Sequence, residues 1–497
     1  MAGVSEPFDL AVIGGGINGA GIARDAAGRG ARVLLLETGD LAQGTSSAST
    51  KLVHGGLRYL EHYEFALVRE ALAERERIWR IAPHIMRPLR LVLPHRQGLR
   101  PRWLLRLGLF LYDHIGGRRS FPATAALDLA RHPAGAPLKP EFRRGWAFSD
   151  GWVDDARLVV LNARDAADRG AAIRTRCEAT ALRRDNGGWT IEAGGETFRA
   201  RAVVNVAGPA VIELARRAGV ETGRKLRLVR GSHIVVPRLY EHDWAYFFQH
   251  PDGRIFFAIP YEYAFTLIGT TDVDHHGPLD RVEASEAEVA YLCEGVNGYF
   301  RKPVSPADVV WSYAGVRPLV DDGSRRPEAA TRGYSFALDG DDGAAPLLSV
   351  FGGKITTYRR LAEEALERLA PHLPALRGPA WTGGEALPGG DFPKEDAASL
   401  AAGLARDYPF LGDATAQRLT RAYGTIARDI LGEARSADDL GSDFGYGLSE
   451  REVEHLVGRE WARTAEDVLW RRSKLGLRFT PAQSEALADY LETRSGA

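Results

Sequence analysis

Apolar and polar positions near the start of the chain follow the periods of a strand, a helix and a second strand. Leu10 to Ile13 form a short apolar run that predicts a buried strand, and Val33 to Leu36 form a second one. The residues between them have the pattern of an amphipathic helix that ends near Arg29-Gly30. The N-terminal residues therefore predict a βαβ unit.

A glycine-rich turn joins the first predicted strand to the helix. Gly14, Gly16 and Gly19 have GxGxxG spacing, and Glu37 follows the second strand. Gly14 permits the tight turn, Gly16 lets the backbone approach a pyrophosphate, and Gly19 lets the helix pack on the strand. The free N–H groups of the helix N-terminus favour the pyrophosphate, and Glu37 would accept hydrogen bonds from an adenosine ribose. We predict a dinucleotide site here, rather than a glycine-rich turn in an ordinary βαβ unit.

The rest of the chain continues with alternating elements and then becomes rich in β-strands. Asp154 and Asp155 precede a helix that runs to about Gly170, and we interpret the two carboxylates as helix caps rather than as an acid/base pair. Residues 232–274 are dominated by aromatic and β-branched residues, which predicts an antiparallel sheet inserted into the nucleotide-binding domain. Strands are expected at residues 172–176, 189–192, 203–206, 234–236, 255–259 and 266–269.

The last hundred residues are predicted to be helical. Pro388-Gly389-Gly390-Asp391 has the composition of a linker. Ser449-Glu450-Arg451-Glu452 and Thr480-Pro481-Ala482-Gln483 beyond it have the spacing of capping boxes. We therefore expect a separate helical domain at residues 391–497.

Composition limits the function classes that the chain can belong to. The 497 residues are 45% hydrophobic and 26% charged, with a formal net charge of -1, so nothing draws the protein toward nucleic acid. Cys177 and Cys293 are far apart and have no metal-ligand spacing, which predicts no metal site and suits a reducing compartment. We expect no signal peptide and no spanning helix, because no apolar run is long enough.

Three further segments favour FAD over NAD as the dinucleotide. Small hydroxyl residues and glycines at residues 45–56 could line a pyrophosphate and a flavin. Residues 202–209 form an apolar strand that ends in a glycine turn, as in a strand that returns beside the cofactor. Residues 347–357 form a strand, a Gly-Gly turn and a helix start that could stabilise negative charge on a reduced flavin. The chain has no second strand, GxGxxG and helix unit, so electrons are expected to leave to an acceptor other than NAD.

The expected fold class is α/β. It consists of an FAD-binding Rossmann-like domain with an inserted antiparallel β-sheet substrate domain, plus a C-terminal all-helical domain. We assign residues 1–388 to the FAD-binding domain, with substrate-binding segments at about 74–150 and 225–330 interleaved in it, and residues 391–497 to the helical domain.

Strings along nearly the whole chain resemble the FAD-dependent glycerol-3-phosphate dehydrogenases of bacterial respiration. The most specific are HGGLRYLE at residues 54–61 and SVFGGKITTYR at residues 349–359. The resemblance implies oxidation of sn-glycerol 3-phosphate to dihydroxyacetone phosphate, hydride transfer to FAD and reduction of membrane quinone. The other matching segments are residues 14–21, 45–53, 231–237, 268–272 and 315–319.

The predicted cofactor-binding residues lie in the fingerprint, at Glu37 after the second strand, in the hydroxyl-rich run, in the late strand and in the second glycine turn. They are Gly14, Gly16, Ile17, Asn18, Gly19, Glu37, Thr45, Ser46, Ser47, Ser49, Lys51, Leu52, His54, Gly55, Gly56, Ala207, Gly208, Gly353, Lys354, Ile355 and Thr356.

A glycerol phosphate site needs cations for the phosphate, a base for the C2 hydroxyl and a C2–H directed at the flavin. We expect His233 to be the general base and Arg317 to bind phosphate and stabilise alkoxide character; His54 is the competing base. For any one arginine of this chain, the alternative is a solvated surface charge. The substrate-binding candidates are Arg58, Tyr59, Thr271, Arg332 and Lys354.

Residues 99–112 mix arginine with Trp, Phe and Leu, which is typical of a helix at a membrane interface. A core helix with arginines at its rim is the alternative. Arg118 and Arg119 would add attraction to anionic lipid. The resemblance implies a homodimer in the cytoplasm, peripherally attached to the inner face of the cell membrane.

Two other functions remain open at this point. A glycerol-3-phosphate oxidase would differ only in passing electrons to oxygen. A FAD-containing module that binds RNA or protein belongs to another class, and it predicts a basic surface that this nearly neutral chain does not suggest.

Overall fold

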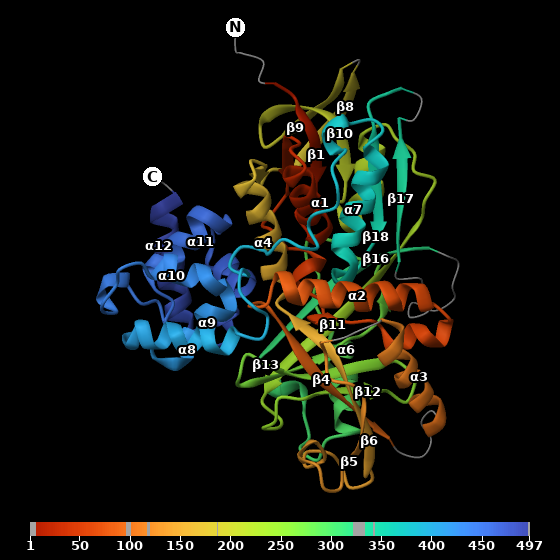
Figure 1. Cartoon of the computed structure of the whole chain (residues 1–497), viewed down its shortest axis with the longest axis vertical. Coiled ribbons are helices and arrows are strands. Elements are labelled where there is room, and N and C mark those ends of the chain that lie inside the picture. The colour runs from red at the N-terminus through yellow and green to blue at the C-terminus, as the bar shows by residue number, and fades with distance from the viewer. Residues whose placement is uncertain are drawn as a thin grey trace.

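The computed structural model describes residues 6–95, 101–116, 120–185, 187–321, 333–340 and 343–495. Two β-sheets share the body of the molecule, and the C-terminal helices lie at one side of it (Figure 1). The expected α/β class with a helical C-terminal part is confirmed.

The first sheet has the parallel centre that the βαβ unit predicts. β1 (Phe8–Ile13) lies between β2 (Val33–Leu36) and β10 (Glu196–Asn205), and both neighbours run parallel to it. β7 (Ala172–Arg174) pairs in parallel with β2, and β18 (Leu347–Gly352) pairs in parallel with β10. The antiparallel strands of the same sheet are β8 (Ala179–Asp185), β9 (Gly188–Ala193) and β17 (Tyr334–Asp339).

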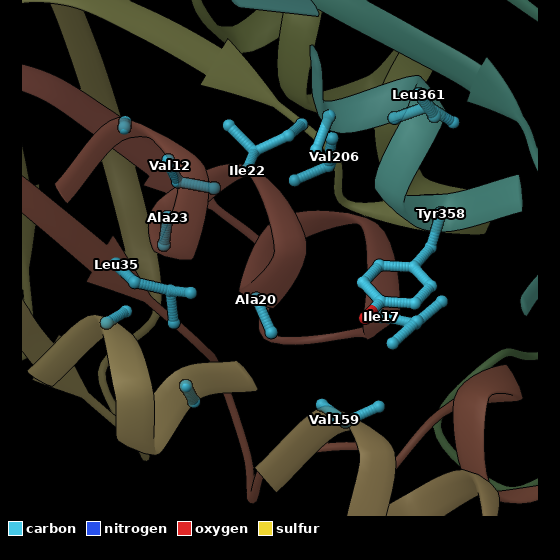
Figure 2. Close-up of a cluster of buried hydrophobic side chains, with 14 of the residues drawn as sticks. Val12, Ile17, Ala20, Ile22, Ala23, Leu35, Val159, Val206, Tyr358 and Leu361 are labelled. Atoms are coloured by element: carbon cyan, nitrogen blue, oxygen red, sulfur yellow. The ribbon is translucent and has the colours of Figure 1, made fainter. Parts of the chain in front are cut away.

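Helices cover the parallel strands with apolar side chains. α1 (Ile17–Gly28) packs against both α4 (Asp155–Asp168) and α7 (Tyr358–Leu369). Figure 2 shows Ala20 of α1 facing Val159 of α4 and Ile17 of α1 beside Tyr358 of α7, and all four side chains are buried. Small residues on α1 are required because the neighbouring helices approach closely, and such burial of apolar surface is the main driving force of folding.

The second sheet joins two distant stretches of the chain. Its strand order is β15-β11-β14-β13-β12-β4-β6-β3, with β16 beside β11 and β5 beside β6. The early strands are β3 (Leu52–Val53), β4 (Met86–His95), β5 (Ala125–Asp128) and β6 (Arg144–Val153). The later strands are β11 (Leu226–Pro237), β12 (Ala245–Gln249), β13 (Ile255–Tyr261), β14 (Phe265–Gly269), β15 (Val273–Asp274) and β16 (Trp311–Val320).

The expectation of an antiparallel inserted sheet needs one correction. Every pairing in this sheet is antiparallel except the one between β12 and β4, which is parallel, with Ala245 opposite Leu91. The parallel pairing arises where the early and late stretches meet, because no hairpin joins these two strands. The remaining helices of this part are α2 (Phe65–Ile81), α3 (Arg102–Ile115) and α6 (Glu286–Asn297), whereas α5 (Val211–Arg217) packs against β10 and β18 of the first sheet.

The C-terminal helices have an apolar core of their own. Leu404, Leu419 and Leu456 belong to this core, which is separate from the cluster around α1. The two predicted caps form, but only the Thr480 cap is reciprocal, with Gln483; at Ser449 only the side chain accepts, from the Glu452 N–H. The helices are α8 (Ala397–Asp407), α9 (Gly412–Tyr423), α10 (Ala427–Leu431), α11 (Glu450–Glu460) and α12 (Pro481–Ser495).

Buried ion pairs dock the C-terminal helices on the first sheet. Arg157 of α4 makes a bidentate pair with Glu460 at the end of α11. Asp40, in the loop after β2, accepts from both Arg471 and Arg472. These arginines lie in a π-helical segment, Asp467–Ser473, so the C-terminal part contacts a loop of the nucleotide-binding unit directly. Within the described residues, no helix has both the length and the apolar character needed to cross a bilayer.

Candidate active site

One cavity of about 1810 Å³ runs between the two sheets. At one end it is bordered by Cys177 and Glu178, which follow β7; at the other by Phe247 and Phe257 of the second sheet. Most of the residues that the sequence assigns to cofactor and substrate come together along this cavity, although they are spread over more than 300 positions of the chain.

The glycine fingerprint forms the dinucleotide end of the cavity. Gly14 has φ +122°, and a Cβ on Gly19 would overlap the carbonyl oxygen of Gly14. Glycine is therefore required for the turn and for the close packing of α1 on β1. Gly16 is the N-cap of α1 and has no side chain to cap it, so the N-terminal end of the helix borders the cavity.

Glu37 lies beside this turn, as predicted, with both oxygens engaged. Oε2 accepts from the Gly15 N–H at 2.6 Å and Oε1 accepts from the Gly39 N–H at 2.8 Å. Burial raises the pKa of Glu37, and the N–H groups of Gly39 and Gly15 act against this rise. The carboxylate therefore ties the fingerprint turn to the loop after β2, and it also lines the cavity.

The hydroxyl-rich run is held from several sides. The Thr45 hydroxyl donates to the Val316 carbonyl at 2.6 Å, and Ser46 Oγ accepts from the Ile17 N–H at 3.0 Å. The Ser49 N–H and hydroxyl both donate to Asp155 Oδ2. All three residues line the cavity, which gives a preformed cradle for the middle of an extended cofactor.

The structure places three predicted cofactor residues behind the cavity wall instead of on it. The Lys51 Nζ is buried and donates to Asp155 at 2.7 Å, so this cation supports the hydroxyl-rich run from behind. The Gly55 N–H donates to the Tyr112 hydroxyl oxygen, and Gly19 serves helix packing. None of the three is among the described residues that line the cavity, whereas the other predicted cofactor residues are.

Two predicted substrate cations, Arg317 and Lys354, line the cavity. Arg317 on β16 pairs with Asp272 and donates to the Thr270 hydroxyl at 2.8 Å. The Lys354 ammonium lies 3.8 Å from the centre of the Tyr59 ring. Arg317 comes from a strand and Lys354 from a glycine turn, and both line the same cavity. The side chain of Arg58 and the whole of Arg332 lie outside the described residues.

His233 and Thr271 lie close to Arg317, but neither is among the described residues that line the cavity. Thr271 is buried, and its hydroxyl donates to Glu288 at 2.7 Å; its neighbour Thr270 is the threonine that lines the cavity. His233 is 1% exposed, and its Nε2 lies 2.9 Å from the Thr50 hydroxyl oxygen. Burial lowers the pKa of His233 well below its ordinary value, and the charges of Arg317 and Lys51 lower it further.

Several residues that line the cavity were not predicted from the sequence. Thr50, Thr270, Asp272 and Tyr313 line the cavity, and Trp470 reaches it from the C-terminal helices. Thr50, Thr270 and Asp272 lie inside strings that match the resembled family, so those strings could have identified them. Trp470 carries no such signal; its ring stacks on Trp311 with centroids 4.4 Å apart only because the two units dock.

The fold and the cavity define a dinucleotide-binding oxidoreductase, and similarity to known proteins specifies the dinucleotide. Residues 9–359 match the family model described as FAD dependent oxidoreductase, and residues 381–493 match the C-terminal domain of alpha-glycerophosphate oxidase. The chain belongs to the FAD-dependent oxidoreductase family. Its cofactor is FAD, and the glycine cradle and the helix N-terminus described above fit that group.

Relatives and a solved structure agree with this assignment. The chain is 50% identical over 493 residues to the aerobic glycerol-3-phosphate dehydrogenase of Escherichia coli, covering 98% of this chain and 97% of that one. It is 51% identical over 494 residues to the D-erythritol 1-phosphate dehydrogenase of Brucella abortus, covering 98% of each. The FAD complex of glycerol-3-phosphate dehydrogenase from Bacillus halodurans has a TM-score of 0.76 at 26% identity, covering 98% of this chain and 94% of that one.

Proposed function

We propose that the protein oxidises sn-glycerol 3-phosphate to dihydroxyacetone phosphate and passes the electrons to a membrane quinone. The observation that carries this proposal is that two cations, Arg317 and Lys354, line the same cavity as the FAD fingerprint. A cavity that offers a flavin cradle and then two cations suits a small phosphorylated alcohol. The relative from Escherichia coli supports the same substrate by its name.

Each cation has a partner that fixes its position. Asp272 and Thr270 hold the Arg317 guanidinium at the cavity, and a guanidinium is the cation that suits a phosphate or a developing alkoxide. The Tyr59 ring lies beneath the Lys354 ammonium. When bound, FAD supplies the acceptor for the hydride that leaves the alcohol carbon.

An anaerobic titration tests the proposed reaction. Adding glycerol 3-phosphate to the purified holoenzyme should bleach the flavin absorbance without any pyridine nucleotide. Arg317→Ala should need far more substrate for the same bleaching, because a phosphate loses its bidentate partner, and His233→Ala should slow the bleaching. Flavin absorbance that does not change with this substrate would contradict the proposal.

The acceptor is decided by a second mixing step. The reduced enzyme is mixed with either a soluble quinone analogue or oxygen, and flavin absorbance is followed as it returns. Fast return with quinone and slow return with oxygen is the expected result. The reverse would make the protein an oxidase.

A second polyol phosphate is a candidate substrate. The relative named for D-erythritol 1-phosphate is as similar to this chain as the relative named for glycerol 3-phosphate, so identity does not rank the two. Both substrates carry a phosphate and a secondary alcohol and would use the same cations. Comparing kcat/KM for the two compounds under the same conditions decides between them, and we expect glycerol 3-phosphate to be the better one.

The membrane is proposed to be reached through α3. Its inner side packs on the second sheet through Leu109 and Tyr112. Its outer side exposes large apolar residues between arginines, and Trp103 is 68% exposed to solvent. The exposed apolar residues of this face are Trp103, Leu104, Leu107 and Phe110. Tyr63 and Phe65, which precede α3 in the chain, are exposed as well. Such a face suits insertion into the interfacial layer of a bilayer.

Vesicle flotation tests this surface. The protein should float with vesicles that contain anionic lipid, and Leu107→Glu with Phe110→Glu should abolish flotation because each charge must enter the apolar layer. Tyr446→Glu is the matched control, since Tyr446 is also an exposed aromatic residue but lies among the C-terminal helices. Equal flotation of both variants would contradict the proposal. We also propose a homodimer attached to the inner face of the cell membrane, which sedimentation of the detergent-free enzyme and cell fractionation test.

A further inference from the structure

The His233 ring is locked in a slot of the second sheet. On β11 it lies opposite Gly269 of β14 on one side and Tyr313 of β16 on the other. A Cβ on Gly269 would overlap the imidazole, so the ring fills the space that this glycine leaves open. The Tyr313 ring stacks on the other side, with centroids 4.8 Å apart and planes within 13°. A ring held between two strands in this way cannot turn toward the cavity without repacking the sheet.

Thr50 stands between this ring and the cavity. Its hydroxyl oxygen is 2.9 Å from His233 Nε2, and Thr50 lines the cavity while His233 is not among the described residues that do. Thr50 is itself held in place, because the Ser49 carbonyl next to it accepts from the Tyr313 hydroxyl at 2.9 Å. His233 Nδ1 is buried without a hydrogen-bond partner among the described residues. The polar path from the ring to the cavity therefore passes through the Thr50 hydroxyl.

We infer that Thr50 is a catalytic residue that relays the substrate's hydroxyl proton to His233. This inference rests on the proposed function, since it concerns the secondary alcohol of a polyol phosphate bound in this cavity. The Thr50 oxygen accepts the alcohol proton, and the Thr50 hydroxyl gives its own proton to His233 Nε2. His233 then acts through Thr50 and does not touch the substrate.

The step balances in atoms and charge. The alcohol loses one proton to the Thr50 and His233 pair and one hydride from its carbon to the flavin, and a ketone remains. Thr50 ends with a hydroxyl as it began, and His233 ends as an imidazolium. A weakly basic imidazole is sufficient, because the O–H group of the alcohol becomes strongly acidic as the hydride departs. Without loss of this proton the product would be a protonated ketone, which is a strong acid. The negative charge of Asp272 favours the imidazolium, while Arg317 and Lys51 oppose it.

The experiment measures flavin reduction by glycerol 3-phosphate under anaerobic conditions in rapid mixing. Thr50→Val keeps the shape of the side chain and removes the hydroxyl, and Thr50→Ser restores the hydroxyl. His233→Gln keeps a hydrogen-bonding group that cannot take up the proton. Two readouts other than turnover accompany each variant: the FAD content of the purified protein, and binding of dihydroxyacetone phosphate measured from the change in the flavin spectrum.

The relay predicts that Thr50→Val lowers the limiting reduction rate roughly 100-fold, the size of effect expected for a proton-transfer group. Thr50→Ser should recover it to within roughly 10-fold, with FAD content and product binding unchanged in both. His233→Gln should cost about as much as Thr50→Val, and the double variant should cost no more than either, because both act on one path.

Other outcomes would contradict either the proton relay through Thr50 or the proposed function on which it rests. A Thr50→Val rate within 3-fold of the parent overturns the relay, and so do losses that multiply in the double variant, which would mean that His233 meets the substrate directly. A parent enzyme whose flavin is not reduced by either polyol phosphate overturns the proposed function instead. If Thr50→Val does not retain FAD, Thr50→Ala is measured in its place under the same criteria.

Discussion

Replacing Asp40 with alanine should undock the C-terminal helices and weaken the loop that lines the cofactor cavity. Asp40 is fully buried in the loop after β2. Its carboxylate accepts from Arg471 Nε at 2.6 Å and from two Arg472 nitrogens at 2.7 Å. The Asp40 N–H also donates to Gln43, which lines the cavity. The loop that pairs with Arg471 and Arg472 therefore also forms part of the cavity wall.

The expected loss of folding free energy depends on which partners Arg471 and Arg472 retain without Asp40. Arg471 retains Glu466 and Asp467, whereas Arg472 is fully buried and is left with the Glu460 carbonyl and, at 3.9 Å, the Glu460 carboxylate. Removing one partner of a buried ion pair costs about 3–5 kcal/mol. Because Arg471 stays paired, we expect the lower part of this range, about 3 kcal/mol, which is a large fraction of the stability of a typical protein. The melting temperature should fall by at least about 5 °C.

Thermal unfolding at fixed FAD concentration, followed by tryptophan fluorescence, measures this effect. Trp470 and Trp311 stack across the interface, so undocking also changes their emission. Asp407→Ala is the matched control: Asp407 pairs with Arg406 and Arg428 on the surface, where solvent screens the interaction, and the melting temperature should hardly change. The pair of changes Asp40→Leu and Arg472→Met should recover part of the loss. An Asp40→Ala protein that melts with the control, and retains FAD equally well, would refute the reasoning.

Three other predictions concern the fingerprint, the phosphate site and acid stability. Gly19→Ala should abolish FAD retention and lower stability by about 1–3 kcal/mol, since its Cβ overlaps the Gly14 carbonyl; flavin absorbance and melting check this, and normal FAD content would contradict it. Arg317→Lys should raise KM for glycerol 3-phosphate at least roughly 10-fold, because a point charge replaces a bidentate donor held by Asp272; unchanged steady-state KM would refute it. Burial alone would raise the pKa of Asp467, but the Arg463 N–H and the Arg471 guanidinium hold it at about 2, below the ordinary 3.8. Its contribution of about 2 kcal/mol is complete above pH 4 and is lost as the pH falls toward 2, so Asp467→Asn should flatten the fall in unfolding free energy over that window, and parallel curves for the two proteins would count against it.

The first sheet was predictable because its signals are local. Leu10 to Ile13 and Val33 to Leu36 are apolar runs buried on both faces, and the glycines between them have spacing that only a close helix-strand turn requires. The α4 helix was likewise predicted from Asp154, whose side chain accepts from the Arg157 N–H as an N-cap. The second sheet was foreseen as β-rich and mostly antiparallel. Its parallel β12 and β4 pair was not, since it depends on which distant strands meet at the centre.

At the site, sequence identified which segments come together but not which side chains border the cavity. Thr270 and Thr271 are adjacent, and only the direction of the backbone decides that the first lines the cavity and the second reaches Glu288. Lys51 has φ +60°, an uncommon conformation that no composition signal announces, and its ammonium is directed to Asp155 behind the wall. His233 is buried behind Thr50 and is not among the described residues that line the cavity, which its position in the sequence does not reveal.

The buried pair of Lys51 and Asp155 shows why the hydroxyl-rich loop needs support from outside itself. A loop of small polar residues has backbone groups that must be paired once they are buried. Asp155 accepts from the Ser49 N–H and hydroxyl, and Lys51 donates to the Ser47 carbonyl at 3.1 Å while it neutralises Asp155. Because these two buried charges satisfy Ser47 and Ser49, the Thr50 hydroxyl is left to bridge His233 and the cavity. The carboxylate that the sequence assigns to helix capping is therefore what positions the residue on which the proposed proton path depends.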